Sequence, residues 1–178
     1  MDISRRALLF NSFITAGYST TYALGNSSVE SNSMNDKKTK NKFFELYPIG
    51  SVKRKGKSAH LHIFNKYTDA LKGLDDFSHA LVLYWFDKND TPEKRSILRV
   101  HPRGNKENPL TGVFACRASV RPNLIALSLC KIVSVRDGIV HVDKIDAFDN
   151  SPVLDIKPYI PHIDHIIKDV RVPDWLRD

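Results

Sequence analysis

The segment that most constrains the fold is a run of seven apolar residues, Ala80 to Phe86 (ALVLYWF). The run is continuous and rich in residues that favour β-strands, which predicts a central strand covered on both of its faces. Apolar residues at helical spacing over 67–74, with a glycine near the end, predict one short helix. Further strands are expected at residues 46–52, 60–64, 96–100, 112–116 and 125–135.

The last of these strands begins an expected hairpin. Five apolar residues share one phase of it: Ile125, Leu127, Leu129, Val133 and Val135. Arg136-Asp137-Gly138 supplies a tight turn, and in the return strand Ile145 is out of phase with Val140 and Val142, which predicts a bulge. Seven or eight short strands with one or two short helices indicate a mostly β fold, a small antiparallel β-barrel. The chain has no GxGxxG after its first strand and no βαβ rhythm, which argues against a Rossmann-type cofactor site.

The first 42 residues differ from the rest of the chain. Ser4-Arg5-Arg6 precedes a mostly apolar stretch and Ala23-Leu24-Gly25 offers a cleavage site, as in a twin-arginine-like export signal followed by a polar linker. The alternative is a mis-assigned start, because Met34 is one of only two methionines. We expect a cytoplasmic protein, with export as the alternative. The folded domain is expected over 43–178, without a membrane span.

Basic side chains outnumber acidic ones, 27 Lys and Arg against 20 Asp and Glu. Within the expected domain they form two clusters: Lys53-Arg54-Lys55-Gly56-Lys57, and Lys94-Arg95 with Arg99, Arg103 and Lys106. Basic side chains that share one face bind phosphates, which makes a polyanionic partner a candidate. Ordinary solvated surface loops are the alternative.

The histidines and cysteines offer weaker candidates for chemistry. His60-x-His62 and His162-x-x-His165 could each place two metal ligands together. No cysteine or carboxylate completes either pair at a recognised spacing, so no metal site is expected. Cys116 and Cys130 lie in apolar segments without a neighbouring histidine or helix start that would activate a thiol, which favours packing over catalysis.

Two segments combine turn residues with charged side chains. Gly112 to Asn123 (GVFACRASVRPN) runs from a strand into a turn with two arginines, which can form paired hydrogen bonds with a carboxylate or a phosphate. Arginines that only hold the loop in place are the alternative. Asp146 to Tyr159 (DAFDNSPVLDIKPY) carries an Asp-Asn-Ser-Pro turn that could present polar groups to a hydroxyl-rich ligand such as a ribose. A capped surface turn with ion pairs is the alternative there.

These two segments, in this order, resemble the TrmO (TsaA-like) family of S-adenosylmethionine-dependent tRNA methyltransferases. The family pattern is approximately G-x-F-A-x-R-S-P-x-R-P-N-P-I-G-L-S, followed later by D-x-x-D-G-T-P-V-x-D-I-K-P-Y. The first part matches at Gly112, Phe114, Ala115, Arg117, Arg121, Pro122, Asn123, Ile125, Leu127 and Ser128. The second part matches at Asp146, Asp149, Pro152, Val153, Asp155, Ile156, Lys157, Pro158 and Tyr159.

The resemblance implies a compact β-barrel that forms a homodimer and binds S-adenosylmethionine without a Rossmann fold. It implies methylation of the exocyclic amine of threonylcarbamoyl-adenosine beside the anticodon of tRNA. Asp155, Lys157 and Tyr159 are expected to face the target base, with Asp155 accepting a hydrogen bond from the amine and Tyr159 stacked on the ring. The cofactor site implied by position consists of Asp87, Lys88, Arg117, Arg121, Asn123, Leu127, Asp146, Asp149, Asn150, Ser151 and Pro152.

The sequence departs from the family pattern at several positions. Ala118 and Ser119 replace a serine and a proline, and Asp87 replaces the histidine expected after the central strand. The loop after the first strand, Lys53 to Lys57, is short and basic, in place of the segment that contacts the cofactor in many members. Two other functions stay open: a methyltransferase with a different, extracytoplasmic substrate, and a non-catalytic module that binds the cofactor or RNA.

Overall fold

The computed structural model describes residues 44–56, 58–166 and 168–177. The expected extension of residues 1–42, with its export signal or its alternative start at Met34, lies outside the described residues. Within the described ranges, no helix combines the length and the apolar character that a membrane span requires.

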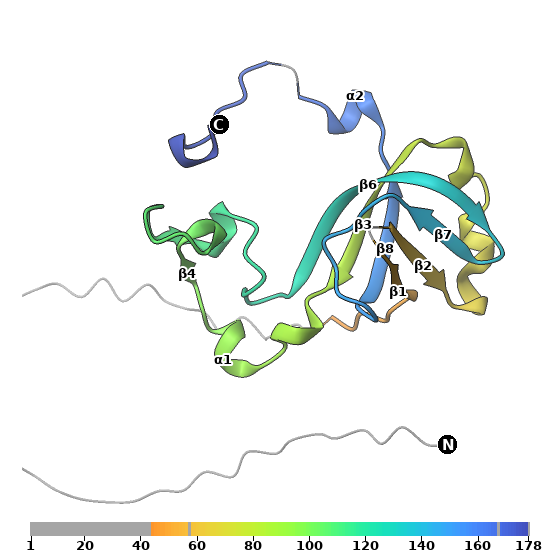
Figure 1. Cartoon of the computed structure of the whole chain (residues 1–178), viewed down its shortest axis with the longest axis horizontal. Coiled ribbons are helices and arrows are strands. Elements are labelled where there is room, and N and C mark those ends of the chain that lie inside the picture. The colour runs from red at the N-terminus through yellow and green to blue at the C-terminus, as the bar shows by residue number, and fades with distance from the viewer. Residues whose placement is uncertain (1–43, 57, 167, 178) are drawn as a thin grey trace, which may run out of the picture. The chain divides into compact units, whose positions relative to one another are not determined.

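A closed antiparallel barrel of six strands forms the body of the domain (Figure 1). Around the barrel the order is β1-β2-β7-β6-β3-β8, and the pairing of Gly50 with Val153 closes the ring between β1 and β8. This confirms the predicted fold class. The strands are β1 (Gly50–Lys55), β2 (Ser58–Ile63), β3 (His79–Trp85), β6 (Ile125–Arg136), β7 (Ile139–Val142) and β8 (Pro152–Pro158).

The other elements are short. The segment between β3 and β6 contains η3 (Asp87–Asn89), α1 (Pro92–Arg95), β4 (Arg99–Val100), η4 (Pro102–Gly104), β5 (Thr111–Gly112) and η5 (Val113–Ala115). β4 and β5 pair with each other and form an arm beside the barrel (Figure 1). The remaining elements are η1 (Asn65–Leu71), η2 (Leu74–Asp76), α2 (Pro161–Asp164) and η6 (Asp174–Leu176).

The core fills the inside of the barrel with alternate residues of each strand. On β3 the inward residues Ala80, Val82 and Tyr84 are buried, as the period of two requires. The other strands add inward side chains of the same kind: Val52, Leu61, Ala126, Cys130, Ile132, Val140, Val142 and Val153. Small and β-branched residues dominate this set, which suits the limited space inside a six-stranded barrel.

Several predicted elements differ from the observed ones at their ends. β1 begins at Gly50 because Pro48 cannot donate to a strand ladder, so the expected strand 46–52 starts four residues too early. The helix expected over 67–74 is the 3₁₀ segment η1, which ends before Gly73 takes a left-handed φ of 82°. The strands expected at 96–100 and 112–116 shrink to the two-residue strands β4 and β5.

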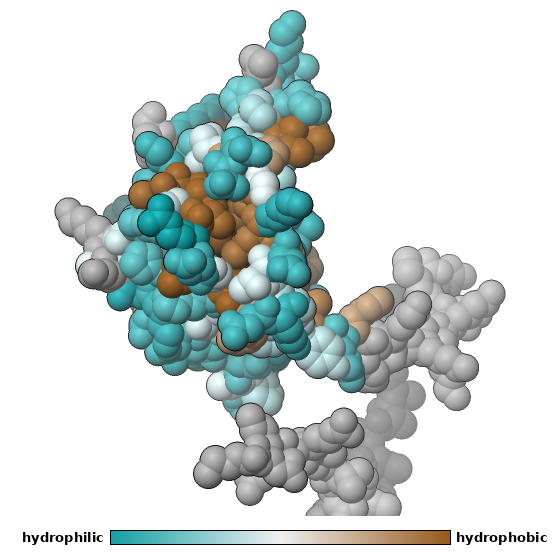
Figure 2. Space-filling view, turned by 90° about the vertical axis from the view of Figure 1, so that its right-hand side faces the viewer, coloured by the Kyte–Doolittle hydropathy of each residue, from teal (hydrophilic) through white to brown (hydrophobic). Residues whose placement is uncertain are grey.

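The phase of β6 is the reverse of what its apolar pattern indicates. Ala126, Cys130 and Ile132 point inward, whereas Leu127 and Leu129 are 43% and 50% exposed. The bulge lies in β6 itself, where the register against β7 shifts between Ile132 and Ser134, and not near Ile145. β3, predicted to be covered on both faces, is buried on its inner face and half-buried on its outer face. Exposed apolar residues therefore gather on the surface, and Figure 2 shows such a cluster within a hydrophilic surround.

β8 is a strand that the sequence did not reveal. No strand was expected here, only the Asp-Asn-Ser-Pro turn that leads into it. In the barrel it lies between β1 and β3, with Asp155 and Lys157 outward opposite Leu83 and Leu81. Because these charged side chains point outward from the strand, they stay in contact with solvent and their desolvation costs little free energy.

Candidate functional site

A large cavity of about 1050 Å³ lies where the β4–β5 arm meets the end of the barrel. The barrel contributes Phe86 and Asp146, and the C-terminal turn contributes Trp175 and Leu176. The arm and the loop after it contribute Val100, His101, Pro102, Arg103, Gly104, Phe114, Ala115, Cys116, Arg117, Ala118, Ser119 and Val120. A cavity of this size, with aromatic walls and a few charged groups, is typical of a site for a small organic ligand.

The backbone around Asp146, which lines this cavity, is held by three hydrogen bonds. The Arg54 guanidinium donates to the carbonyl oxygens on either side of it, Ile145 O at 3.1 Å and Ala147 O at 2.8 Å. The hydroxyl of Tyr84 donates to the carbonyl oxygen of Asp146 itself. Burial raises the pKa of Tyr84, which keeps its hydroxyl protonated as a donor. Three consecutive carbonyls are therefore fixed, and the Asp146 side chain is presented from a rigid backbone.

The Asp-Asn-Ser-Pro turn that follows is bound to β1. The backbone N–H of Arg54 donates to Asp149 Oδ1 at 2.9 Å, and the Lys53 ammonium donates to Asn150 Oδ1. Asn150 has a left-handed φ of 67°, a conformation that asparagine tolerates better than most residues. Lys53 and Arg54 were candidates for phosphate contacts, and here both bind the turn that follows Asp146.

Ser151 connects this turn to the end of β3. Its buried hydroxyl donates to Asp87 Oδ1 at 3.1 Å, and the Lys88 ammonium lies 3.1 Å from Asp87 Oδ2. The structure thus brings together three residues that the resemblance placed in the cofactor site. Asp87 directly follows Phe86, which lines the cavity, although Asp87, Lys88 and Ser151 do not themselves line it.

A second group of side chains, which the sequence patterns did not predict, holds the Arg-Pro-Asn turn. Arg95 lies over the ring of Trp85 at 5.2 Å, pairs with Asp90 at 2.8 Å and donates to the carbonyl of Pro122 at 2.9 Å. The hydrogen bond from Arg95 lowers the pKa of Asp90, which keeps the carboxylate charged. Arg95 was a candidate for phosphate contact, and its planar guanidinium is occupied here by Asp90, Trp85 and the carbonyl of Pro122.

The other residues predicted to bind the cofactor are spread around the cavity. Arg117 lines it, whereas Arg121 is turned back toward the carbonyl of Ala118 at 3.5 Å. Asn123 lies on the exposed turn before β6, and Leu127 points outward from that strand. Pro152, the first residue of β8, is paired with Ser51 of β1.

The three residues expected to face the target base do not line this cavity. Asp155 and Lys157 form an ion pair of 2.7 Å on the outer face of β8, which raises the pKa of Lys157. The backbone of Tyr159 bonds to the carbonyl of His79 at 3.0 Å, seven residues along β3 from Phe86. Seven strand residues span about 23 Å, so within one chain Tyr159 and the cavity are far apart.

The two cysteines differ in their surroundings, and this predicts a difference in reactivity. Cys130 is fully buried in the core, and burial raises the pKa of its thiol to about 12. Cys116 is partly exposed and lines the cavity. We expect a thiol reagent at pH 8 to modify one cysteine in the folded protein and both in denaturant, because the thiolate is the reactive form. Rapid modification of Cys130 in the folded state would contradict this packing.

Residues 38–165 match the family model of the tRNA-methyltransferase O N-terminal domain. The chain belongs to the TrmO family. The structure of TrmO from Pseudomonas aeruginosa has a TM-score of 0.56 to this chain and is 26% identical to it, over 73% of this chain and 62% of that one. The barrel described above is thus the family fold.

Relatives of different lengths share this domain. A probable S-adenosyl-L-methionine-binding protein of Methanocaldococcus jannaschii is 43% identical over 121 residues, which are 68% of this chain and 96% of that protein. The tRNA (adenine(37)-N6)-methyltransferase of Mus musculus is 42% identical over 103 residues, 58% of this chain and 23% of that protein. The chain spans less than two thirds of the TrmO structure and under a quarter of the mouse enzyme.

Proposed function

We propose that this TrmO-family protein is a methyltransferase that uses S-adenosylmethionine to methylate the exocyclic amine of threonylcarbamoyl-adenosine in tRNA. The cavity lined by Asp146 is the observation that carries the proposal, since it combines a carboxylate on a held backbone, an arginine and aromatic walls in one site. The names of the relatives support it from two sides: one is described as binding the methyl donor, another as methylating an adenine of tRNA.

The residues of the cavity fit the chemistry of the donor. Arg117 suits the carboxylate of the methionine part, because a guanidinium donates two parallel hydrogen bonds to such a group. The carboxylate of Asp146 suits the ribose hydroxyls or the amino group. Phe86 and Phe114 supply apolar surface for the rest of the molecule. A volume of about 1050 Å³ leaves room for a nucleoside of this size with part of an acceptor.

In this reaction the main role of the protein is to align the methyl donor with the acceptor. Bound S-adenosylmethionine supplies a methyl group on a sulfonium that is already activated for displacement. The chain's task is to hold donor and acceptor in line and to exclude water. The hydrogen bonds of Arg54 and Tyr84 around Asp146 serve this task, because they fix one wall before any ligand arrives.

We include a homodimer in the proposal, because a second copy would bring its own cavity to the Tyr159 that lies far from the cavity of the first copy. The outer face of β3 and β6 carries six apolar residues in three cross-strand pairs, here called the β3–β6 face. They are Leu81 with Leu129, Leu83 with Leu127, and Trp85 with Ile125. Asp155 and Lys157 border this face on β8. A second copy seated there would cover the apolar pairs, and the carboxylate and ammonium of each copy suit the self-complementary contacts of a twofold interface.

In such a dimer the target base would reach Asp155, Lys157 and Tyr159 of one copy and the donor cavity of the other. Asp155 would accept a hydrogen bond from the amine, which favours a pyramidal nitrogen ready to attack. Tyr159 would stack on the ring.

A charge on the β3–β6 face is expected to separate the dimer. Leu127→Asp places a carboxylate at the centre of the face, and light scattering should report a monomer, with circular dichroism unchanged because the side chain is 43% exposed. Val133→Asp is the matched control, since Val133 is an exposed apolar residue of the same strand beyond Lys131. A monomeric wild-type protein, or equal masses for all three proteins, would refute this interface.

Calorimetry with S-adenosylmethionine tests the donor site. The wild-type protein should bind one donor per chain, and Asp146→Ala should weaken binding by about tenfold or more, because a hydrogen bond to a charged group contributes about 1.5–3 kcal/mol. Asp137→Asn is the control, because Asp137 lies in the β6–β7 turn away from the cavity. Absence of binding by the wild-type protein would count against the whole proposal.

A further inference from the structure

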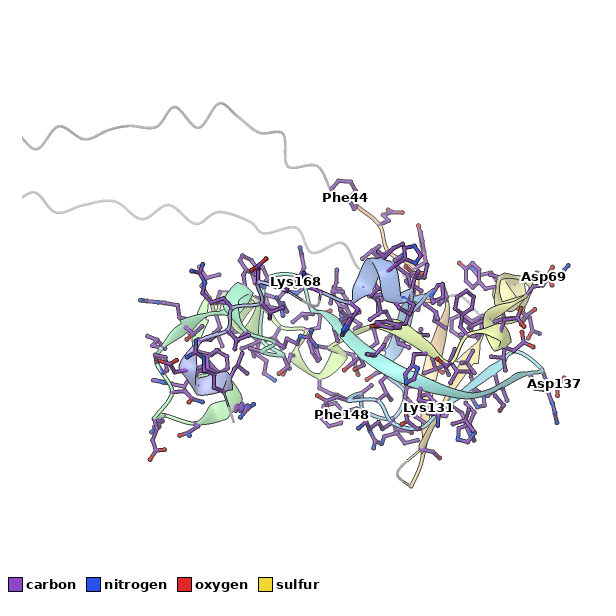
Figure 3. The ribbon with its side chains drawn as sticks, turned by 90° about the horizontal axis from the view of Figure 1, so that it is seen from above. Phe44, Asp69, Lys131, Asp137, Phe148 and Lys168 are labelled. Atoms are coloured by element: carbon purple, nitrogen blue, oxygen red, sulfur yellow. The ribbon has the colours of Figure 1, made fainter. Side chains whose placement is uncertain are left out.

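The C-terminal turn η6 lies against the donor cavity although it falls outside the family match. The family model ends at residue 165, yet Trp175 and Leu176 line the cavity together with the β4–β5 arm. Figure 1 shows the chain leaving the barrel through α2 and ending beside the arm. Seen from above in Figure 3, the same segment passes Lys168 and again ends at the arm. Both views and the lining residues therefore agree on this placement.

The turn exposes its charged residues and places its tryptophan at the cavity wall. Arg177 pairs with Asp174 at 3.0 Å and donates to the carbonyl of Val172 at 3.4 Å, which closes the turn on its outer side. The backbone N–H of Leu176 donates to the carbonyl of Pro173 at 3.0 Å. Asp174 and Arg177 are exposed, whereas Trp175 between them is partly buried at the cavity wall. The polar residues of the turn thus lie outside and its large aromatic residue lies at the cavity.

We propose that Trp175 is a ligand-contacting residue that stacks on the adenine ring of the bound methyl donor. The inference rests on the function proposed above. Arg117 and Asp146 suit the charged and hydroxyl groups of the donor. Three aromatic residues, Phe86, Phe114 and Trp175, line the cavity and could meet its flat purine. An indole offers the broadest flat surface among side chains. Stacking of a base on an aromatic residue strengthens binding by roughly ten- to a hundredfold, whichever base it is.

Two substitutions at this position separate stacking from mere filling of space. Trp175→Ala should weaken the binding of S-adenosylmethionine by roughly ten- to a hundredfold in calorimetry, as expected for loss of a stacked aromatic ring. Trp175→Phe keeps an aromatic face and should bind within about threefold of the wild-type protein. Val170→Ala is the control, because this exposed residue belongs to the same segment and does not line the cavity.

Fluorescence gives a second readout that does not depend on transfer activity. The chain has two tryptophans, Trp85 and Trp175. Addition of S-adenosylmethionine should change the emission of the wild-type protein, and Trp175→Phe, which leaves only Trp85, should remove that change. If the wild-type protein binds the donor but Trp175→Ala binds it equally well or more tightly, the stacking role is wrong. If the wild-type protein does not bind the donor at all, the proposed function fails first, and the role of Trp175 fails with it.

Discussion

Replacing Gly50 with alanine is expected to destabilise the barrel by at least about 3 kcal/mol, the largest effect on stability that we predict for a single methyl group. A Cβ atom at this position would lie 2.3 Å from the carbonyl oxygen of His62 and 3.0 Å from the Cα of Ile63. Both are backbone atoms of β2, so no side chain can move aside. Gly50 also pairs with Val153, where the barrel closes, so a shift of β1 would open the ring.

Urea unfolding followed by circular dichroism measures this effect. Gly112→Ala is the matched control, because a Cβ atom there meets no heavy atom within 4 Å and φ is −61°. The control should change the free energy of unfolding by less than about 1 kcal/mol. Equal stabilities for the two variants would mean that β1 and β2 do not approach each other as closely as the structure has them.

Arg54→Ala is expected to cost about 2–3 kcal/mol of stability and, in addition, most of the affinity for S-adenosylmethionine. The substitution removes both hydrogen bonds to the carbonyls that flank Asp146, at 3.1 and 2.8 Å. Those carbonyls would then need water, and the backbone that presents Asp146 to the cavity would loosen. The coupled loss follows because one side chain supports both the barrel end and the donor site.

Lys53→Ala separates this role from a general effect of positive charge. Lys53 precedes Arg54 on the same strand, and its ammonium bonds to the exposed side chain of Asn150. Its removal should cost less than about 1 kcal/mol. Thermal unfolding and calorimetry on both variants give the comparison. If both substitutions weaken donor binding equally, Arg54 acts through charge and not through the Asp146 backbone.

The barrel could be predicted from local patterns, but the faces of its strands could not. Ala80 to Phe86 indicated a central strand, and the Asp137 turn placed the hairpin of β6 and β7. The shared apolar phase of Leu127 and Leu129 is the exposed face of β6, whereas the small residues Ala126 and Cys130 occupy the core. Alternation identifies the buried face of a strand only where the other face is polar. Because β6 carries apolar residues on its outer face, alternation alone could not assign its faces.

The candidate site was predictable in its residue types more than in its contacts. The resemblance identified Arg117 and Asp146, which line the cavity. The bonds that organise the site join residues distant in sequence: Arg54 to Ala147, and Ser151 to Asp87. Trp175 lies beyond the family match, so only the folded chain could bring it to the cavity. Such pairings depend on barrel closure, which no local pattern encodes.

Transfer of a labelled methyl group from S-adenosylmethionine to tRNA tests the central proposal most directly. The wild-type protein is incubated with one tRNA that carries the threonylcarbamoyl group on the adenosine beside the anticodon, and with the same tRNA without it. We expect label on the exocyclic amine of the modified adenosine and none on the unmodified tRNA. Donor binding without transfer to either tRNA would contradict the proposed methyltransferase activity and would make the protein a binding module.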